Sequence, residues 1–174
     1  MDPNNLIFID ETGANLNMTL LYGRAPKGDR IKMPAPMNRG MQISIIGAIS
    51  TTKVEAALYG EWATNGDIFQ TFITTQLIPN LSPEKVVLLD NVQFHKSDAV
   101  IKAIETTGAR VIFLPPYSPE FNPIEPMWSK LKHVLEFLEP RTFNEFKKAI
   151  KKAFSEVTES DLIGWYNHCG YSIN

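Results

Sequence analysis

Short apolar runs in this sequence end directly at acidic residues. Residues 6–9 and 86–89 carry only aliphatic or aromatic side chains, and Asp10 and Asp90 follow them without a spacer. A run of this kind is typical of a strand that is covered on both faces of a sheet. Ligand sites gather at the carboxyl ends of parallel strands, so we expect Asp10 and Asp90 to emerge at one edge of the sheet.

The remaining pattern predicts an α/β fold with a mixed sheet and helices on both of its faces. Further strands are expected at residues 18–22, 42–49, 53–59 and 111–114. Helices are expected at residues 64–77, 97–108, 124–138, 143–154 and 162–166. This order favours an antiparallel meander followed by parallel strands. The length of 174 residues suits a single domain that spans residues 1–174.

Composition excludes several classes of protein. A hydrophobic content of 44% and a charged content of 21% are ordinary for a globular chain and argue against disorder. Cys169 is the single cysteine, which excludes a disulfide framework and a cysteine zinc site. No apolar run approaches the roughly 20 residues that a membrane span needs, and the first residues do not resemble a signal peptide. We therefore expect no membrane partner and a cytoplasmic location, beside the nucleoid if the source is bacterial.

A third acidic residue, Glu125, begins a predicted helix after a proline-rich turn. Its side chain is long enough to reach back towards Asp10 and Asp90. Three carboxylates forced together repel one another unless a cation intervenes, and all-oxygen ligands suit Mg²⁺ or Mn²⁺. Two such ions would support phosphoryl transfer. Each acid alone also fits ordinary turn or helix-start chemistry, and Glu11 competes with Asp10, since neighbours in a strand face opposite sides.

Basic residues gather in two parts of the chain although the net charge is −2. Residues 24–39 hold five basic side chains, one of them Arg39, and one acidic side chain. Residues 126–152 hold seven basic and three acidic side chains. Such surfaces suit the phosphates of DNA, although solvated helix faces and a mobile loop explain them equally well. The candidate DNA-binding residues are Arg24, Lys27, Arg30, Lys32, His95, Lys96, Lys130 and Lys132.

Two aromatic side chains near these acids have alternative interpretations. His95 could bind a metal, contact a phosphate, act as a general base, or simply pack at the start of a helix. Trp128 could stack on a base, but we expect it in the core because large aromatic side chains are usually buried there.

Residues 88–96 and 115–132 resemble the DDE catalytic domain of mariner-superfamily transposases, most closely the bacterial insertion-sequence branch. The second segment carries the specific run Pro-Pro-Tyr-Ser-Pro-x-x-Asn-Pro-Ile-Glu-x-x-Trp. The 34 residues between Asp90 and Glu125 also match the family's separation of its last two acids.

This resemblance implies an RNase H-like fold in which Asp10, Asp90 and Glu125 are the catalytic, metal-binding triad. It implies Mg²⁺-dependent cleavage of transposon ends, with Mn²⁺ as a substitute and two ions in the site. Joining of the 3′-hydroxyl to target DNA, typically at TA, would follow on a homodimer assembled on DNA. We expect no counterpart of the family's N-terminal helix-turn-helix domain within residues 1–174. The alternatives are an RNase H-like nuclease without strand transfer and a non-catalytic, domesticated DNA-binding domain.

Overall fold

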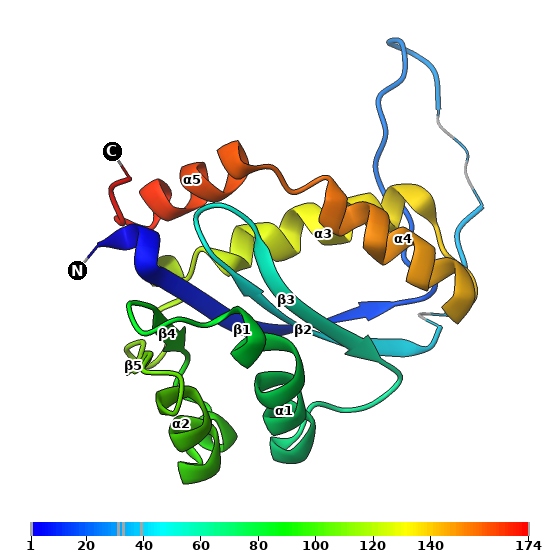
Figure 1. Ribbon diagram of the computed structural model, residues 1–174. Helices are drawn as coiled ribbons and strands as arrows, with labels where there is room; N and C mark the ends of the chain where they lie inside the picture. The colour runs from blue at the N-terminus through cyan, green and yellow to red at the C-terminus, as the bar shows by residue number, and fades with distance from the viewer. Residues whose placement is uncertain (1, 31, 33, 39, 174) are drawn as a thin grey trace.

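The computed structural model describes residues 2–30, 32, 34–38 and 40–173, and its centre is a five-stranded sheet (Figure 1). The strand order is β3-β2-β1-β4-β5. The strands are β1 (Leu6–Asn15), β2 (Gln42–Ile49), β3 (Val54–Gly60), β4 (Val86–Leu89) and β5 (Arg110–Phe113). β1 pairs antiparallel with β2 and parallel with β4, and this confirms the mixed sheet.

Helices cover both faces of the sheet, as predicted. One layer contains α1 (Gly66–Phe72) and α2 (Asp98–Glu105), and the other contains α3 (Ile124–Leu138), α4 (Phe143–Ser155) and α5 (Glu159–His168). The alternation of side chains along β1 divides the core between them. Leu6 and Phe8 pack towards the α3 layer, whereas Ile7 and Ile9 pack towards the α1 layer. β1 is therefore buried on both faces.

The first strand is longer than the sequence indicates, and the strand predicted at residues 18–22 is wrong. β1 runs to Asn15, so Asp10 lies in its middle, because β2 pairs with it from Phe8 to Asn15. β1 already has β2 and β4 as neighbours, so residues 18–22 have no position beside β1 in the sheet. These residues leave the sheet instead, and Leu21 and Tyr22 are exposed.

The described residues between 18 and 41 form a projecting arm, which rises clear of the body of the molecule (Figure 1). Its base is held by the connection between α3 and α4. The Arg141 guanidinium donates a hydrogen bond to the backbone oxygen of Met18 at 2.9 Å. The hydroxyl of Thr19 donates to the carboxylate of Glu139. Arg39, one of the basic residues of this segment, lies outside the described residues.

The predicted helix at residues 64–77 is present, but it begins slightly later and its winding changes. Asn65 caps it by accepting a hydrogen bond from the backbone N–H of Ile68. After α1 the chain continues as a π-helical turn at Ile73–Leu77. Both parts carry buried apolar side chains against the sheet, so the predicted apolar stripe is retained.

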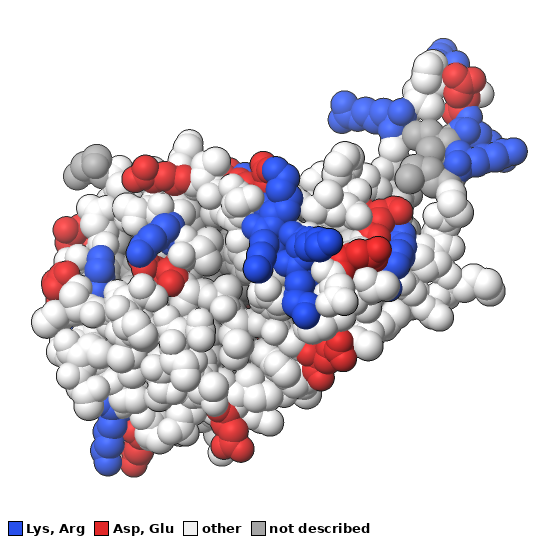
Figure 2. Space-filling view, turned by 45° about the vertical axis from the view of Figure 1, so that its right-hand side comes forward, with Lys and Arg blue, Asp and Glu red and all other residues white. Residues whose placement is uncertain are grey.

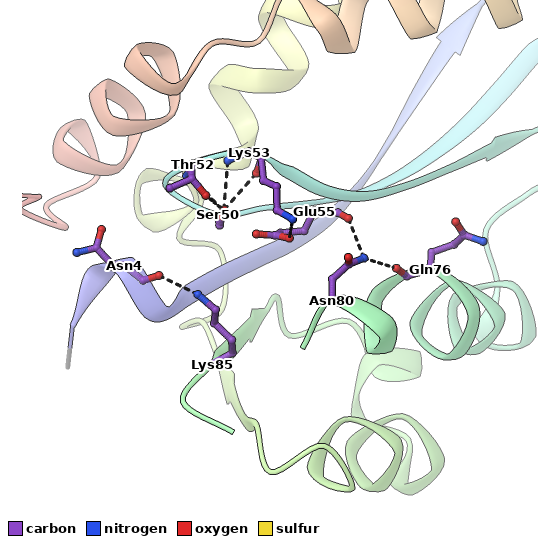
Figure 3. Close-up of polar contacts among 8 residues, drawn as sticks. All are labelled: Asn4, Ser50, Thr52, Lys53, Glu55, Gln76, Asn80 and Lys85. Carbon is purple, nitrogen blue, oxygen red and sulfur yellow. Dashed lines mark hydrogen bonds and ion pairs between the residues drawn. The ribbon is translucent and has the colours of Figure 1, made fainter. Parts of the chain in front are cut away.

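The end of the sheet where β1 begins is fastened by polar contacts (Figure 3). The Ser50 hydroxyl oxygen accepts hydrogen bonds from two backbone N–H groups of the turn between β2 and β3. The Lys85 ammonium donates to the backbone oxygen of Asn4 at 3.2 Å. The Asn80 amide donates to the backbone oxygen of Glu55 at 3.1 Å. These contacts tie β1, β3 and the segment before β4 together. No helix among the described residues is long and apolar enough to cross a membrane.

Candidate active site

The parallel register of β1 and β4 brings Asp10 and Asp90 to the same level of the sheet. Phe8 lies opposite Leu88, and each aspartate follows two residues later along the chain. Asp10 continues in β1, whereas β4 stops at Leu89 and Asp90 begins the loop beyond it. The end of β4 therefore opens the sheet beside Asp10.

A cavity of about 490 Å³ occupies this opening. Asp10, Asp90 and Glu125 all line it, together with Lys96 and the proline-rich segment 115–119. Among the described residues, no three His, Cys, Asp or Glu side chains lie close enough together to hold a metal ion. The three predicted carboxylates thus share one cavity without forming a closed ligand shell.

Asp10 is nearly buried, and this burial dominates its electrostatics. Its side chain receives a hydrogen bond from the Trp128 indole, with 3.2 Å between Nε1 and Oδ2. Burial is the main cause that raises the pKa of Asp10 to about 7. The charges of Glu11 and Glu125 add to this rise, whereas the hydrogen bonds from the Glu11 backbone and the Trp128 indole oppose it. A cation beside Asp10 would remove this penalty.

Trp128 is in the core, as the sequence suggested, and it also supports Asp10. Its indole lies over Gly47 of β2, which pairs directly with Asp10 of β1. A Cβ atom at Gly47 would come within 2.6 Å of the Trp128 ring. Because Gly47 has no side chain, the indole can lie close to β2, and in this position its N–H reaches Asp10. Sequence reasoning missed this contact because 118 positions separate the two partners.

Asp90 has the opposite electrostatic environment. One oxygen, Oδ1, accepts hydrogen bonds from Nδ1 of His95 at 2.5 Å and from the backbone N–H of Val92 at 3.1 Å. Partial burial acts to raise the pKa of Asp90, but these hydrogen bonds outweigh it and lower the pKa below its usual value. Asp90 is therefore held in its charged form.

His95 is fully buried, which corrects its assignment as a DNA contact. Its Nδ1 faces Asp90, its Nε2 lies 2.8 Å from Oε1 of Glu11, and its ring packs 4.2 Å from that of Phe69. Burial acts to lower the pKa of His95, but the two carboxylates raise it to about 9. The packing interpretation of His95 is the one that fits. Glu11 points to the side of the sheet opposite Asp10, as strand alternation requires.

The predicted basic residues fall into separate regions. Lys96 lies on the cavity wall. Lys130 is paired with Asp161 of α5 at 2.6 Å, and Lys132 lines a hollow between α3 and the arm. The remaining four, Arg24, Lys27, Arg30 and Lys32, are exposed on the arm, where Figure 2 shows basic side chains clear of the body. The structure thus places only Lys96 beside the carboxylates.

The donor set of the cavity fits a hard divalent cation. Its ligand atoms are carboxylate oxygens, which Mg²⁺ and Mn²⁺ prefer, and their mutual repulsion is the kind that such an ion relieves. Asn122 also lines this cavity, and its Oδ1 is buried without a hydrogen-bond partner among the described residues. A buried amide oxygen ordinarily has a partner, so a hydrated ion or a ligand donor would satisfy it.

Comparison with known proteins agrees with this geometry. Residues 5–148 match the family model described as DDE superfamily endonuclease, and no curated protein matches the sequence. The structure resembles that of the pre-cleavage Mos1 transpososome, with a TM-score of 0.77 and 16% identity over 96% of this chain and 52% of that one.

Two further crystal structures show the same likeness. The mariner Mos1 paired-end complex with Mg gives a TM-score of 0.73 and 19% identity, covering 95% of this chain and 53% of that one. The catalytic domain of Mos1 mariner transposase gives 0.67 and 15%, covering 96% and 76%. The chain spans about half the length of the transposases in the two complexes. The fold is therefore RNase H-like, and the chain belongs to the family of DDE superfamily endonucleases.

Proposed function

We propose that this chain is the catalytic domain of a DNA transposase that cleaves DNA ends and joins them to target DNA. The observation that carries the proposal is the meeting of Asp10, Asp90 and Glu125 in one cavity at the end of β4. Membership of the DDE endonuclease family supports the same reaction class. Both chemical steps would be in-line displacements at phosphorus, first by water and then by a DNA 3′-hydroxyl.

In this proposal the three carboxylates hold the divalent ions. Bound Mg²⁺ or Mn²⁺, in a pair, would activate the attacking oxygen and stabilise the leaving one. Asp90 is already charged, whereas burial makes the charge on Asp10 unfavourable until a cation is present. Glu125 starts α3 and is exposed, so its longer side chain can swing towards the two aspartates.

Basic side chains would guide the DNA towards this cavity. Lys96 is placed to contact a phosphate next to the carboxylates. The arm would bind the DNA backbone farther away through Arg24, Lys27, Arg30 and Lys32. Lys130 and Lys132 would have a secondary role, since Lys130 is engaged with Asp161.

The partners follow from the same proposal. The Mos1 structures are of a transpososome, a strand transfer complex and paired-end complexes. We infer that this chain likewise acts on transposon ends and target DNA as a homodimer assembled on DNA. A TA target and a bacterial, cytoplasmic setting stay predictions of the sequence resemblance.

Substitution of a central ligand tests the reaction. Asp90→Asn should abolish Mg²⁺-dependent nicking of DNA while the protein remains folded, because it removes a charged ligand without changing shape. Nicking at the wild-type rate by folded Asp90→Asn would contradict the proposal.

A pre-cut DNA end separates a transposase from a plain nuclease. Supplied with a 3′-hydroxyl end and target DNA, the protein should form joined products. Hydrolysis without joining would favour an RNase H-like nuclease. Measured DNA binding without affinity for Mn²⁺ in calorimetry would favour a non-catalytic DNA-binding domain.

A further inference from the structure

His95 connects two carboxylates that come from neighbouring parts of the sheet. Its Nδ1 lies 2.5 Å from Oδ1 of Asp90, beyond β4, and its Nε2 lies 2.8 Å from Oε1 of Glu11, in β1. The side chain of His95 is fully buried, and that of Glu11 is 16% exposed. The three side chains therefore form a continuous chain of hydrogen bonds beneath the cavity.

The two oxygens of Asp90 are used differently. Oδ1 takes both hydrogen bonds, from the His95 ring and from the backbone N–H of Val92. Among the described residues, Oδ2 receives no hydrogen bond, and Asp90 lines the cavity. With Oδ1 fixed at two points, rotation of the carboxylate is restricted, and Oδ2 is the atom left for a cation.

The imidazole ring itself is held in place from three sides. The rings of Phe69 and Phe94 lie 4.2 and 4.6 Å away, centroid to centroid. Glu11 occupies the nitrogen that faces away from Asp90. A turn of the ring would break the contact with Glu11 and push against the aromatic rings. Packing and Glu11 together direct Nδ1 at Asp90.

Other roles for His95 do not fit this geometry. A metal ligand or a general base needs a nitrogen that reaches the cavity, but both ring nitrogens face carboxylates and the ring is buried. His95 is also absent from the lining of the cavity, whereas its neighbour Lys96 is part of it. His95 can thus influence chemistry in the cavity only through Asp90.

We propose that His95 is a positioning residue that presents Oδ2 of Asp90 to the bound divalent ion, and that Glu11 orients His95 for this purpose. The inference rests on the proposed function, because it concerns the metal site of that reaction. It also gives Glu11 a role distinct from metal binding. Partners that orient metal ligands in this way typically change metal affinity or activity by about 10–100-fold when they are lost.

Two amide substitutions separate the two hydrogen bonds of the ring. The amide N–H of His95→Asn can take the place of Nδ1 and keep the bond to Asp90. The amide N–H of His95→Gln can take the place of Nε2 and keep the bond to Glu11. We expect His95→Gln to weaken Mn²⁺ binding in calorimetry and to slow Mg²⁺-dependent nicking by about 10–100-fold. His95→Asn should keep both quantities much closer to those of the wild type.

The thermal unfolding midpoints of the metal-free variants measure how far each substitution merely destabilises the fold. If Mn²⁺ affinity and nicking follow only the midpoints, with no difference between Asn and Gln of equal stability, the proposal is overturned. Wild-type Mn²⁺ affinity in His95→Gln would overturn it as well. In contrast, a wild-type protein that neither binds Mn²⁺ nor differs from Asp90→Asn in nicking would overturn the proposed function itself.

Glu11→Gln gives an independent test should His95→Gln fail to fold. It removes the charge opposite Nε2 but leaves the bond between His95 and Asp90. We expect a loss of Mn²⁺ affinity of several-fold, smaller than that of His95→Gln. An unchanged affinity would show that Glu11 does not orient the ring, and a loss larger than that of Asp90→Asn would make Glu11 a metal ligand; each result contradicts the proposal.

Discussion

Asp10 and Asp90 lie at the same level of adjacent strands, yet their surroundings shift their pKa values in opposite directions. Asp10 is buried and receives one side-chain hydrogen bond from the neutral Trp128 indole, and its pKa rises to about 7. Asp90 is partly exposed, accepts from His95 and the Val92 backbone, and has a lowered pKa. The sheet sets the positions of the two carboxylates, whereas the residues packed around them set their charge.

This difference suits a site that must hold a cation and also remain folded without one. Two fully charged, unpaired carboxylates in a closed cavity would repel strongly. Here the charge of Asp90 is stabilised by hydrogen bonds, and the charge of Asp10 is favoured only when a cation compensates for burial.

The metal-free protein should lose stability between about pH 4 and pH 7 because of Asp10. The pKa of this carboxyl is about 7 in the fold, against an ordinary value of 3.8 for aspartate. In that window the unfolded chain binds fewer protons, so the free energy of unfolding falls as pH rises, by at most about 4 kcal/mol. Urea unfolding in EDTA, with Asp10→Asn as the reference, measures the difference.

Mg²⁺ provides the matched control for this measurement. A saturating ion should compensate for the charge of Asp10 and flatten the pH dependence of the wild type, with little effect on Asp10→Asn. A wild type and Asp10→Asn that lose stability in parallel between these pH values would show that Asp10 is not the group responsible.

Gly47→Ala should disturb Asp10 without changing any atom of Asp10. The new Cβ would lie 2.6 Å from the Trp128 ring and displace it. Overpacking of this kind costs about 1–3 kcal/mol, and the indole N–H would move away from Asp10. Chemical unfolding and Mn²⁺ calorimetry measure the two consequences.

Gly13→Ala in β1 is the matched control for Gly47→Ala. Its Cβ would meet the end of the Gln42 side chain at 3.2 Å, which can move aside. We expect its stability to differ little from that of the wild type. If both substitutions change stability and Mn²⁺ affinity equally, displacement of the Trp128 ring is not the cause of these changes.

Much of the site follows from the sequence because its signals are local. An apolar run followed by an acid marks Asp10 and Asp90, and a proline-rich turn before a helix marks Glu125. The connections between these residues are not local. Glu11 and His95 are separated by 84 positions, and only the pairing of β1 with β4 brings them together. The sequence alone therefore predicts a DNA contact for His95, whereas the fold buries it.

The length of β1 could not be predicted for a similar reason. Residues 11–15, Glu-Thr-Gly-Ala-Asn, have the composition of a turn. They extend β1 because β2 supplies partners up to Gln42, and this tertiary pairing overrides local preference. The same pairing removes residues 18–22 from the sheet and sends them into the arm.

Trp128→Phe removes the hydrogen bond to Asp10 together with part of the buried indole, so the pH dependence of stability, and not its absolute value, reports on the bond. The ring remains apolar, but the N–H that donates to Oδ2 is lost. Because this bond lowers the pKa of Asp10, its removal should raise that pKa further and extend the pH-dependent loss of stability to higher pH. The pH-dependent part of the change in the free energy of unfolding should be about 1 kcal/mol, in addition to the cost of the smaller ring in the core.

Trp165→Phe on α5 provides the comparison for Trp128→Phe, since it makes the same chemical change at a partly buried position away from the cavity. Its pH dependence should follow that of the wild type. If the pH dependence of stability shifts equally in both variants, the loss of the hydrogen bond to Asp10 is not its cause.

Neutralisation of the arm should leave both aspartates unchanged and alter only the binding of DNA. The side chains of Arg24, Lys27 and Arg30 are exposed and none lines the cavity, so Mn²⁺ affinity and stability should match the wild type. Each lost phosphate contact should reduce the slope of log K against log salt by about 0.9 on duplex DNA.

Neutralisation of Lys147, Lys148 and Lys151 of α4 is the matched control. It tests whether DNA binding depends on the arm or on any three exposed basic side chains. If the salt slope is unaltered after neutralisation of the arm, the arm does not contact DNA phosphates. If the Mn²⁺ affinity changes, the arm influences the carboxylates.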